Sequence, residues 1–163
     1  MGIIKNQLRT ALVICGVTGD LTTRKLIPAL YELHIAGKLP DDLVVIGFAR
    51  RDWTDEEMRS HLREGVLVHA RTQQIDDSAL NNLLSRMRYV RSTFDEIDGY
   101  QRLNKLLSEL EVGNKLYYLA APPQSYPTVV ERIGEARVPD GTQGWTRIVV
   151  EKPYGNDLKS AEY

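Results

Sequence analysis

The segment GVTGDL, residues 16–21, combines residue types that could bind a pyrophosphate. It follows a run of apolar residues, and its glycines would let the backbone approach a ligand closely. A helix that begins after it would add free N–H groups and a partial positive charge. The spacing is G-x-x-G rather than the dinucleotide-binding G-x-G-x-x-G, so an ordinary strand-to-helix turn remains an alternative. Asp20 is expected to cap the helix rather than to contact an anionic phosphate.

The segment ARRD, residues 49–52, could select between two nucleotide cofactors. In a strand-helix-strand unit, Asp or Glu after the second strand binds a free ribose 2′-hydroxyl, whereas arginine accommodates a 2′-phosphate. Arg50 and Arg51 therefore predict NADP as the cofactor, because a guanidinium pairs with phosphate through two hydrogen bonds. Two solvated arginines on a surface loop are the alternative interpretation, and Asp52 leaves NAD binding open.

The segment IVVEKP, residues 148–153, places a lysine directly after an apolar run. We expect this run to be a buried strand. Ligands of open α/β sheets bind outside the carboxyl ends of the strands, so Lys152 would point toward the same crevice as the two segments above. An ordinary surface lysine is the alternative interpretation.

Apolar runs alternate with segments of helical periodicity along the chain. This alternation predicts an α/β fold with a doubly wound, mainly parallel sheet and helices on both faces, as in Rossmann-like dinucleotide-binding domains. A chain of 163 residues has the size of one domain, and we expect a single dinucleotide-binding domain over residues 1–163. The strands are predicted at residues 11–15, 43–49, 88–92, 115–120 and 146–151, and the helices at 26–36, from 54 onward, and at 76–87, 98–110 and 125–136.

Two helix starts carry specific signals. Thr54 is followed three residues later by Glu57, which predicts a capping box at the start of the second helix. Pro28 cannot donate a backbone hydrogen bond, so the regular part of the first helix either begins near Ile27 or is kinked there.

Bulk properties exclude several classes of function. The net charge is −1, from 21 basic and 22 acidic residues, so no whole-molecule field would recruit nucleic acid or an anionic membrane. The sequence has no apolar run of membrane-spanning length and no secretory signal, and we expect a cytoplasmic protein. Cys15 ends an apolar run and is expected to be buried, and the three histidines show no metal-binding spacing.

Five blocks of the sequence, taken in order, resemble the amino-terminal coenzyme domain of the glucose-6-phosphate dehydrogenase family. The family pattern G-x-x-G-D-L-A is present with Thr22 in place of alanine. The resemblance implies an enzyme that oxidises glucose 6-phosphate to 6-phosphogluconolactone with NADP, the first step of the pentose phosphate pathway, and that is a homo-oligomer when complete. The five blocks are residues 16–40, 44–53, 88–103, 116–136 and 144–161.

The resemblance also implies roles for individual residues. Arg50 would meet the 2′-phosphate, and Ala121 and Pro122 would line the nicotinamide side. Lys152 would touch both the substrate and the nicotinamide region. The cofactor-binding residues that the resemblance implies are Gly16, Thr18, Gly19, Asp20, Leu21, Lys25, Arg50, Tyr89, Ala121, Pro122 and Lys152.

The resemblance further implies that the family's catalytic histidine, a general base, and its Asp-His-Tyr substrate segment would lie beyond Tyr163. His34, His61 and His69 are not expected to replace that base, because each lies on a predicted helix that does not open into the crevice. We therefore expect no catalytic residue and no metal site in this chain. The sequence also looks cut short, because residues 157–163 begin a further predicted helix.

Two other functions remain open. Another NAD(P) oxidoreductase whose coenzyme domain also ends in Glu-Lys-Pro would explain the two ends of the chain but not its GDL and YQRL segments. A non-enzymatic module that binds NADP and acts through a partner would be consistent with the missing base.

Overall fold

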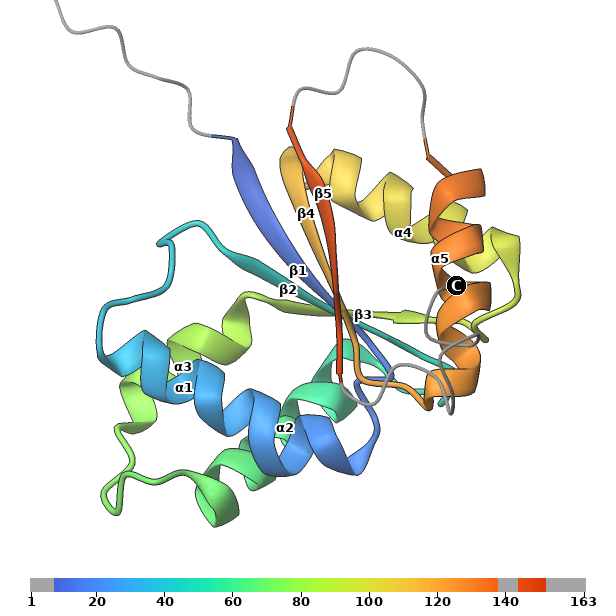
Figure 1. The fold of residues 1–163 in the computed structure, drawn as a ribbon. Helices are drawn as coiled ribbons and strands as arrows, with labels where there is room; N and C mark the ends of the chain where they lie inside the picture. The colour runs from blue at the N-terminus through green and yellow to red at the C-terminus, as the bar shows by residue number, and fades with distance from the viewer. Residues whose placement is uncertain (1–7, 138–143, 152–163) are drawn as a thin grey trace, which may run out of the picture.

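The apolar runs form a five-stranded parallel sheet in the computed structural model, which describes residues 8–137 and 144–151 (Figure 1). The strand order is β3-β2-β1-β4-β5, so the first strand lies at the centre and the winding reverses between β1 and β4. This arrangement confirms the doubly wound fold. The strands are β1 (Arg9–Cys15), β2 (Val44–Ala49), β3 (Met87–Arg91), β4 (Val112–Leu119) and β5 (Thr146–Val150).

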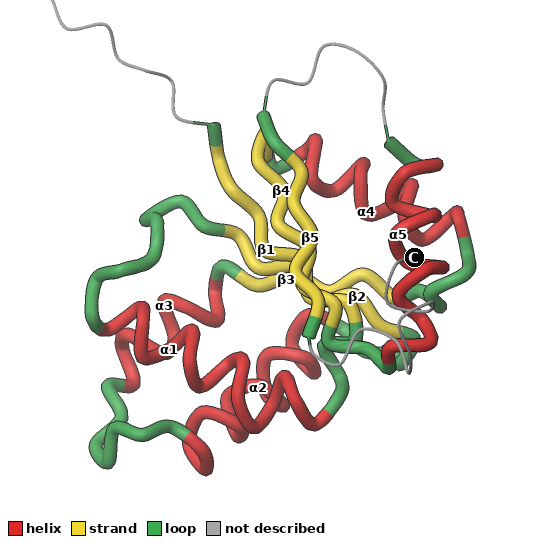
Figure 2. Tube along the Cα trace, in the orientation of Figure 1, coloured by secondary structure: helices red, strands yellow, loops and turns green. Residues whose placement is uncertain are grey.

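Helices cover both faces of this sheet (Figures 1 and 2). On the central strand, Leu12 and Ile14 belong to the apolar core under α1, α2 and α3, whereas Val13 and Cys15 belong to the core under α4 and α5. The alternation of side chains along a strand therefore supplies two cores from one apolar run. The helices are α1 (Ile27–Ile35), α2 (Asp55–His69), α3 (Asp77–Ser85), α4 (Ile97–Glu109) and α5 (Tyr126–Glu135).

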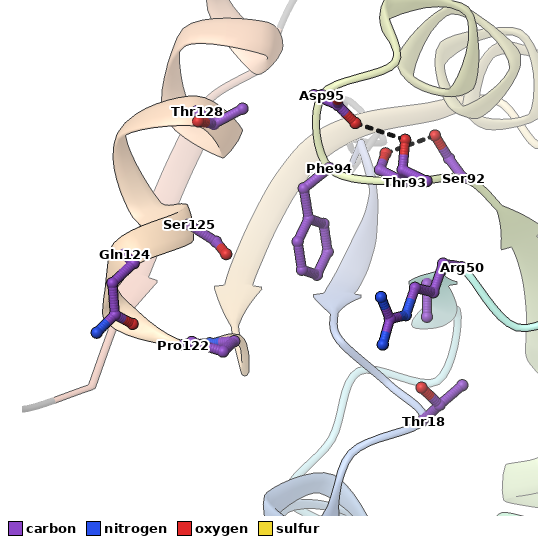
Figure 3. A pocket seen from close by; sticks show the side chains of 11 residues that line it. Thr18, Arg50, Ser92, Thr93, Phe94, Asp95, Pro122, Gln124, Ser125 and Thr128 are labelled. Carbon is purple, nitrogen blue, oxygen red and sulfur yellow. Dashed lines mark hydrogen bonds between the residues drawn. The ribbon is translucent and has the colours of Figure 1, made fainter.

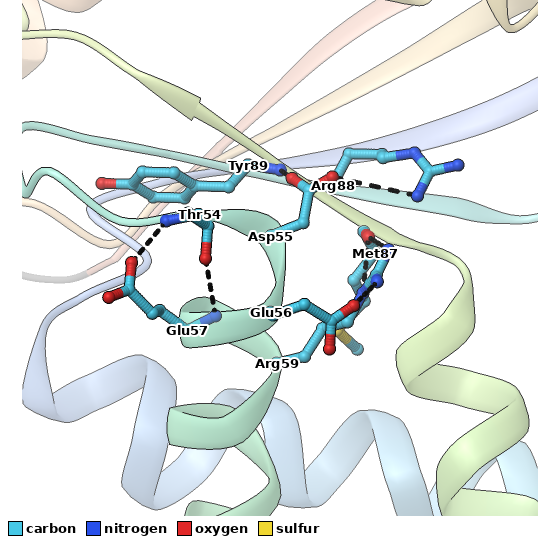
Figure 4. Close-up of polar contacts among 8 residues, drawn as sticks. All are labelled: Thr54, Asp55, Glu56, Glu57, Arg59, Met87, Arg88 and Tyr89. Atoms are coloured by element: carbon cyan, nitrogen blue, oxygen red, sulfur yellow. Dashed lines mark hydrogen bonds and ion pairs between the residues drawn. The ribbon is translucent and has the colours of Figure 1, made fainter.

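The capping box predicted at the start of α2 is confirmed (Figure 4). Thr54 Oγ1 accepts a hydrogen bond from the Glu57 N–H at 3.2 Å, and Glu57 Oε2 accepts one from the Thr54 N–H at 2.7 Å. The next residue, Asp55, accepts a hydrogen bond from the Tyr89 N–H at 2.7 Å. The amino-terminal end of α2 is thus bound to β3, and the loop between β2 and α2 is fixed at both of its ends.

The regular part of the first helix begins at Ile27, which is the first of the two starts that the sequence allowed. A π-helical segment, Thr22–Leu26, precedes it, and the Ile27 N–H donates to the Thr22 carbonyl. Pro28 is the second residue of α1 and has no N–H to donate, and the wider π-helical turn before it carries the helix past this missing donor.

Two predictions about strands are wrong. Met87 is the first residue of β3 and pairs with Val45, whereas the sequence placed it at the end of a helix. The segment around β5 was expected to be a buried strand, but Ile148 and Val149 are 37% and 39% exposed. Among the described residues β5 is paired on one side only, by β4, so it lies at an edge of the sheet.

Candidate functional site

A pocket of about 610 Å³ lies at the carboxyl ends of β1, β2, β3 and β4 (Figure 3). Each of these strands is followed by a loop that lines it. Thr18 comes from the loop after β1, Arg50 from the loop after β2, Phe94 from the loop after β3, and Pro122 and Ser125 from the segment after β4. Doubly wound sheets bind ligands at this edge, next to the point where the winding reverses.

The loop after β1, residues 16–19, is called the glycine loop here, and Gly16 fixes its course. Gly16 has a φ of +92°, and a Cβ at this position would lie 2.5 Å from the Ala120 carbonyl oxygen. Its N–H donates to the Phe48 carbonyl at 2.7 Å. Only glycine fits here without strain, because the backbone is left-handed and touches the end of β4 directly.

The rest of the glycine loop folds back on Gly16. The Gly19 N–H and the Thr22 hydroxyl both donate to the Gly16 carbonyl, at 3.0 and 3.4 Å. Thr22 is fully buried, so the hydroxyl that replaces the alanine of the family pattern has an acceptor for its proton. Within the described part of the chain, the backbone N–H groups of Thr18 and Asp20 donate to no backbone carbonyl of a turn or loop. These groups are free to bind an anion.

Asp20 does not cap the helix in the predicted way. It is the first helical residue, and its exposed carboxylate lies 3.8 Å from Arg24 Nε. Leu21 is half-buried behind the loop, and Lys25 is exposed on the π-helical segment. The side chains of Asp20, Leu21 and Lys25 do not line the pocket, and Thr18 is the residue of this segment that does.

The two arginines after β2 have separate positions. We call residues 50–52 the arginine loop. Arg50 is exposed, lines the pocket and directs its guanidinium toward Thr18 (Figure 3). No carboxylate of the described segments forms an ion pair with it. Arg51 instead lies over the Trp53 ring, with Cζ 5.2 Å from the ring centroid. Of the predicted pair, Arg50 is therefore the residue available to a ligand in the pocket.

Tyr89 lies outside the pocket, where the resemblance did not place it. Its hydroxyl lies 3.0 Å from the Ala49 carbonyl and 2.6 Å from the Arg51 carbonyl, to which it donates. Burial raises the pKa of Tyr89 to about 12, so the hydroxyl keeps its proton at neutral pH. Phe94 supplies the aromatic ring of the pocket instead. Its position just after the predicted strand was a signal in the sequence that pointed to this edge.

The charges of the pocket are separated along its length. At the end opposite Arg50, the Thr93 hydroxyl donates to Asp95 Oδ1 at 2.7 Å, and this hydrogen bond lowers the pKa of Asp95 (Figure 3). Asp95 is therefore ionised at neutral pH and disfavours a second negative charge near it. A phosphate is accommodated best between Arg50 and Thr18.

The two residues predicted to border the nicotinamide, Ala121 and Pro122, follow the end of β4. Pro122 lines the pocket, and Ala121 beside it is half-buried. A short 3-10 turn, Pro123–Ser125, leads from there into α5. The sequence did not predict the polar side chains from this region that also line the pocket, Gln124, Ser125 and Thr128. Lys152 lies outside the described residues.

The described residues offer no exposed thiol, no histidine in the pocket and no metal site. Cys15 is completely buried, as predicted, and burial raises the pKa of its thiol to about 12. No histidine lines the pocket, and no group of three or more His, Cys, Asp or Glu in the described ranges could hold a metal ion. None of the described helices has both the length and the apolar character needed to cross a membrane.

Comparison with known proteins relates this site to one family. Residues 13–163 match the family model described as "Glucose-6-phosphate dehydrogenase, NAD binding domain". The chain is 38% identical to glucose-6-phosphate 1-dehydrogenase of Chlamydia pneumoniae, over 93% of this chain and 31% of the relative. It is 37% identical to "Glucose-6-phosphate 1-dehydrogenase 6, cytoplasmic" of Arabidopsis thaliana, over 99% of this chain and 33% of the relative. The chain therefore spans about a third of the length of these curated relatives.

Solved structures agree with this relation. A glucose-6-phosphate dehydrogenase in complex with its substrate glucose 6-phosphate superposes with a TM-score of 0.84 at 32% identity, over 95% of this chain and 32% of that one. Glucose-6-phosphate 1-dehydrogenase from Mycobacterium avium superposes with a TM-score of 0.81 at 30% identity, over 94% of this chain and 32% of that one.

Proposed function

Because the chain belongs to the glucose-6-phosphate dehydrogenase family, we propose that it is the NADP-binding domain of a cytoplasmic, homo-oligomeric enzyme of the pentose phosphate pathway. That enzyme oxidises glucose 6-phosphate to 6-phosphogluconolactone. The observation that carries the choice of NADP is the position of Arg50, whose guanidinium lies in the pocket at the end of β2 and forms no ion pair with a carboxylate of the described residues. An arginine at this position compensates the charge of a 2′-phosphate.

The residues of the pocket divide the binding of the cofactor among them. The N–H groups of Thr18 and Asp20, at the glycine loop, bind the pyrophosphate, and Gly19 leaves room for it. Arg50 binds the 2′-phosphate, and Pro122 with Ala121 borders the nicotinamide. When bound, the cofactor accepts a hydride from the sugar.

Other residues implied by the family lie beside the glycine loop and the arginine loop. Leu21 and Lys25 follow the glycine loop on the helix side, and Tyr89 supports the arginine loop through the Arg51 carbonyl. Lys152 contacts the substrate and the nicotinamide region. The proton that leaves the sugar hydroxyl needs a base, and we assign that base to the part of the family protein beyond this domain.

Calorimetry with NADP and NAD tests the proposal. Hydrogen bonds to charged groups contribute about 1.5 to 3 kcal/mol, so Arg50→Ala should lose about tenfold or more in NADP affinity and little in NAD affinity. Arg86→Ala is the matched control, because Arg86 carries the same charge before β3, at the opposite end of the strands. Equal losses for NADP and NAD in Arg50→Ala would contradict the assignment of Arg50 to the 2′-phosphate.

Activity provides a second test. The 163-residue chain should reduce NADP with glucose 6-phosphate no faster than a blank without enzyme, since no histidine of the described residues lines the pocket. Saturable oxidation of glucose 6-phosphate by this chain would show that the base lies within it. Tight NADP binding by a full gene product that never oxidises the sugar would favour a non-enzymatic NADP-binding module instead.

A further inference from the structure

A chain of contacts runs from the glycine loop to the arginine loop through α2, and none of its side chains lines the pocket. It begins at Thr23, one residue after the buried Thr22. Thr23 Oγ1 lies 3.3 Å from the Gly19 carbonyl oxygen, to which it donates, and 3.0 Å from His61 Nε2. His61 lies on α2, 38 residues further along the sequence.

The chemistry of the hydroxyl group fixes the direction of these hydrogen bonds. A threonine hydroxyl has one proton, so when it donates to the Gly19 carbonyl it must accept from His61 Nε2–H. The Gly19 carbonyl is then held toward the helix by Thr23, whose own N–H also points to it at 3.4 Å. In a trans peptide unit the carbonyl and the following N–H point in opposite directions, so this contact also fixes the direction of the Asp20 N–H.

His61 also contacts Trp53, the residue that follows the arginine loop. The His61 ring lies against the Trp53 ring, with centroids 4.9 Å apart, and the Arg51 guanidinium lies over the Trp53 ring. The Arg51 carbonyl in turn accepts a hydrogen bond from the Tyr89 hydroxyl at 2.6 Å. His61 is therefore in direct contact with one residue that holds the glycine loop and with one that holds the arginine loop.

Close packing leaves little freedom at this contact. Gly65 lies one helical turn after His61, on the same side of α2. A Cβ at Gly65 would lie 2.7 Å from the Thr23 carbonyl oxygen and 2.8 Å from Thr23 Cγ2. The helix thus touches the π-helical segment through backbone atoms, and a shift of α2 would be transmitted to Thr23.

We propose that His61 is a positioning residue that sets the separation between the glycine loop and the arginine loop. The inference rests on the proposed function, since it assumes that one NADP molecule spans both loops. A bound NADP gains from both loops only when they are already at the right separation, because ordering them on binding would reduce the affinity.

Three variants separate the hydrogen bond from the packing. His61→Phe keeps a ring against Trp53 but cannot donate to Thr23. His61→Gln keeps an N–H near the position of Nε2, and Thr23→Val removes the hydroxyl with little change of shape. His69→Phe is the matched control, because His69 is an exposed histidine at the end of the same helix. Each is measured with NADP by calorimetry and with 2′-AMP, which reaches only the arginine loop, by NMR titration.

Removal of one neutral hydrogen bond should reduce the NADP affinity of His61→Phe and of Thr23→Val by about 2- to 10-fold. Affinity for 2′-AMP should stay at the wild-type value, His61→Gln should recover most of the loss, and the double variant His61→Phe/Thr23→Val should bind NADP about as well as either single variant. Thermal unfolding of each variant shows whether it is folded, and His61→Gln and Thr23→Val carry the test if His61→Phe is not.

The possible results are distinct. Unchanged NADP affinity in His61→Phe and Thr23→Val overturns the inference and leaves the proposed function standing. Equal losses for NADP and 2′-AMP also overturn it, since His61 would then support only the arginine loop. A wild-type chain that binds neither ligand refutes the proposed function itself, and the inference with it.

Discussion

Replacing Gly16 with alanine should be among the most destabilising single-methyl changes in this chain. The substitution acts in two ways that the structure separates. It places a side chain at a φ of +92°, and it puts a Cβ 2.5 Å from the Ala120 carbonyl oxygen and 3.0 Å from the carbonyl carbon. Both atoms belong to the backbone at the end of β4, so no side-chain rotation relieves the contact.

The magnitude follows from these two effects. A non-glycine residue in a sparsely populated backbone region costs about 1 to 3 kcal/mol. Forcing an extra carbon into a packed region costs about 1 to 3 kcal/mol more. Gly16→Ala should therefore lower the free energy of unfolding by about 2 to 6 kcal/mol, a large part of the stability of an ordinary domain.

Two other glycines provide matched controls. Gly37 has a φ of +68° with no atom within 4 Å of an added Cβ, so Gly37→Ala measures backbone strain without a clash. Gly134 lies in α5 with no atom within 4 Å and no positive φ, so Gly134→Ala should be neutral or stabilise by about 0.5 to 1 kcal/mol. Urea unfolding followed by circular dichroism gives the three values.

The expected order of stability is Gly134→Ala, then Gly37→Ala, then Gly16→Ala. The residual folded Gly16→Ala protein should also bind NADP less tightly, because the displaced carbonyl moves the glycine loop. A Gly16→Ala variant no less stable than Gly37→Ala would refute the reasoning, since the contact with Ala120 would then have no energetic consequence.

Three further predictions follow from single sites. Gly19→Val should weaken the binding of NADP and NAD alike, because its methyl groups would occupy the pyrophosphate space. The protein should still fold, since the added Cβ would lie 3.3 Å from the Gly16 carbonyl oxygen, farther than the contact made by Gly16→Ala. Undiminished binding by calorimetry would contradict the anion site. Cys15, with a pKa of about 12, should have a thiolate fraction of about 10⁻⁴ at pH 8, so a thiol reagent should label it only in urea. Hydrogen bonds from Thr72 lower the pKa of Glu32, so the stability that this carboxylate adds is present above its ordinary pKa of 4.5 and is lost as pH falls through the lowered pKa. The stability difference between wild type and Glu32→Gln should therefore shrink in acid, and a constant difference from pH 7 to pH 3 would exclude this linkage.

The order of the elements could be predicted from the sequence because each element has a local signal. β2 and residues 11–15 of β1 form buried apolar runs, and the capping box at Thr54 marks the start of α2. The exposure of β5 had no such signal. Its residues, Thr146–Val150, have the composition of a central strand, and its place at an edge follows from the strand order. Strand order depends on contacts between distant segments, which local patterns do not record.

The candidate site was predicted in part, for a related reason. Gly16 and Arg50 follow strands directly, and the carboxyl end of a parallel strand has a known position in the fold. The direction of a side chain within a strand is harder to predict when both faces are apolar. Tyr89 packs with Met87 on the α2 side of the sheet, so its ring lies behind the arginine loop, and Phe94 from the following loop reaches the pocket. The pairing of His61 with Thr23 had no sequence signal, because it depends on the packing of two helices.

The glycine loop is held by different contacts on its two sides, and this has a consequence for cofactor binding. On one side Gly16 lies against Ala120, and the chain continues from there into Ala121, which we propose borders the nicotinamide. On the other side Gly19 is held through Thr23 by His61. A change at the end of β4 should therefore move the glycine loop and the nicotinamide border together, whereas a change at His61 should move the loop relative to Arg50. The two halves of the dinucleotide should respond separately: substitutions at Ala120 should affect binding of the nicotinamide half, and substitutions at His61 should affect how well the pyrophosphate and the 2′-phosphate are bound at the same time.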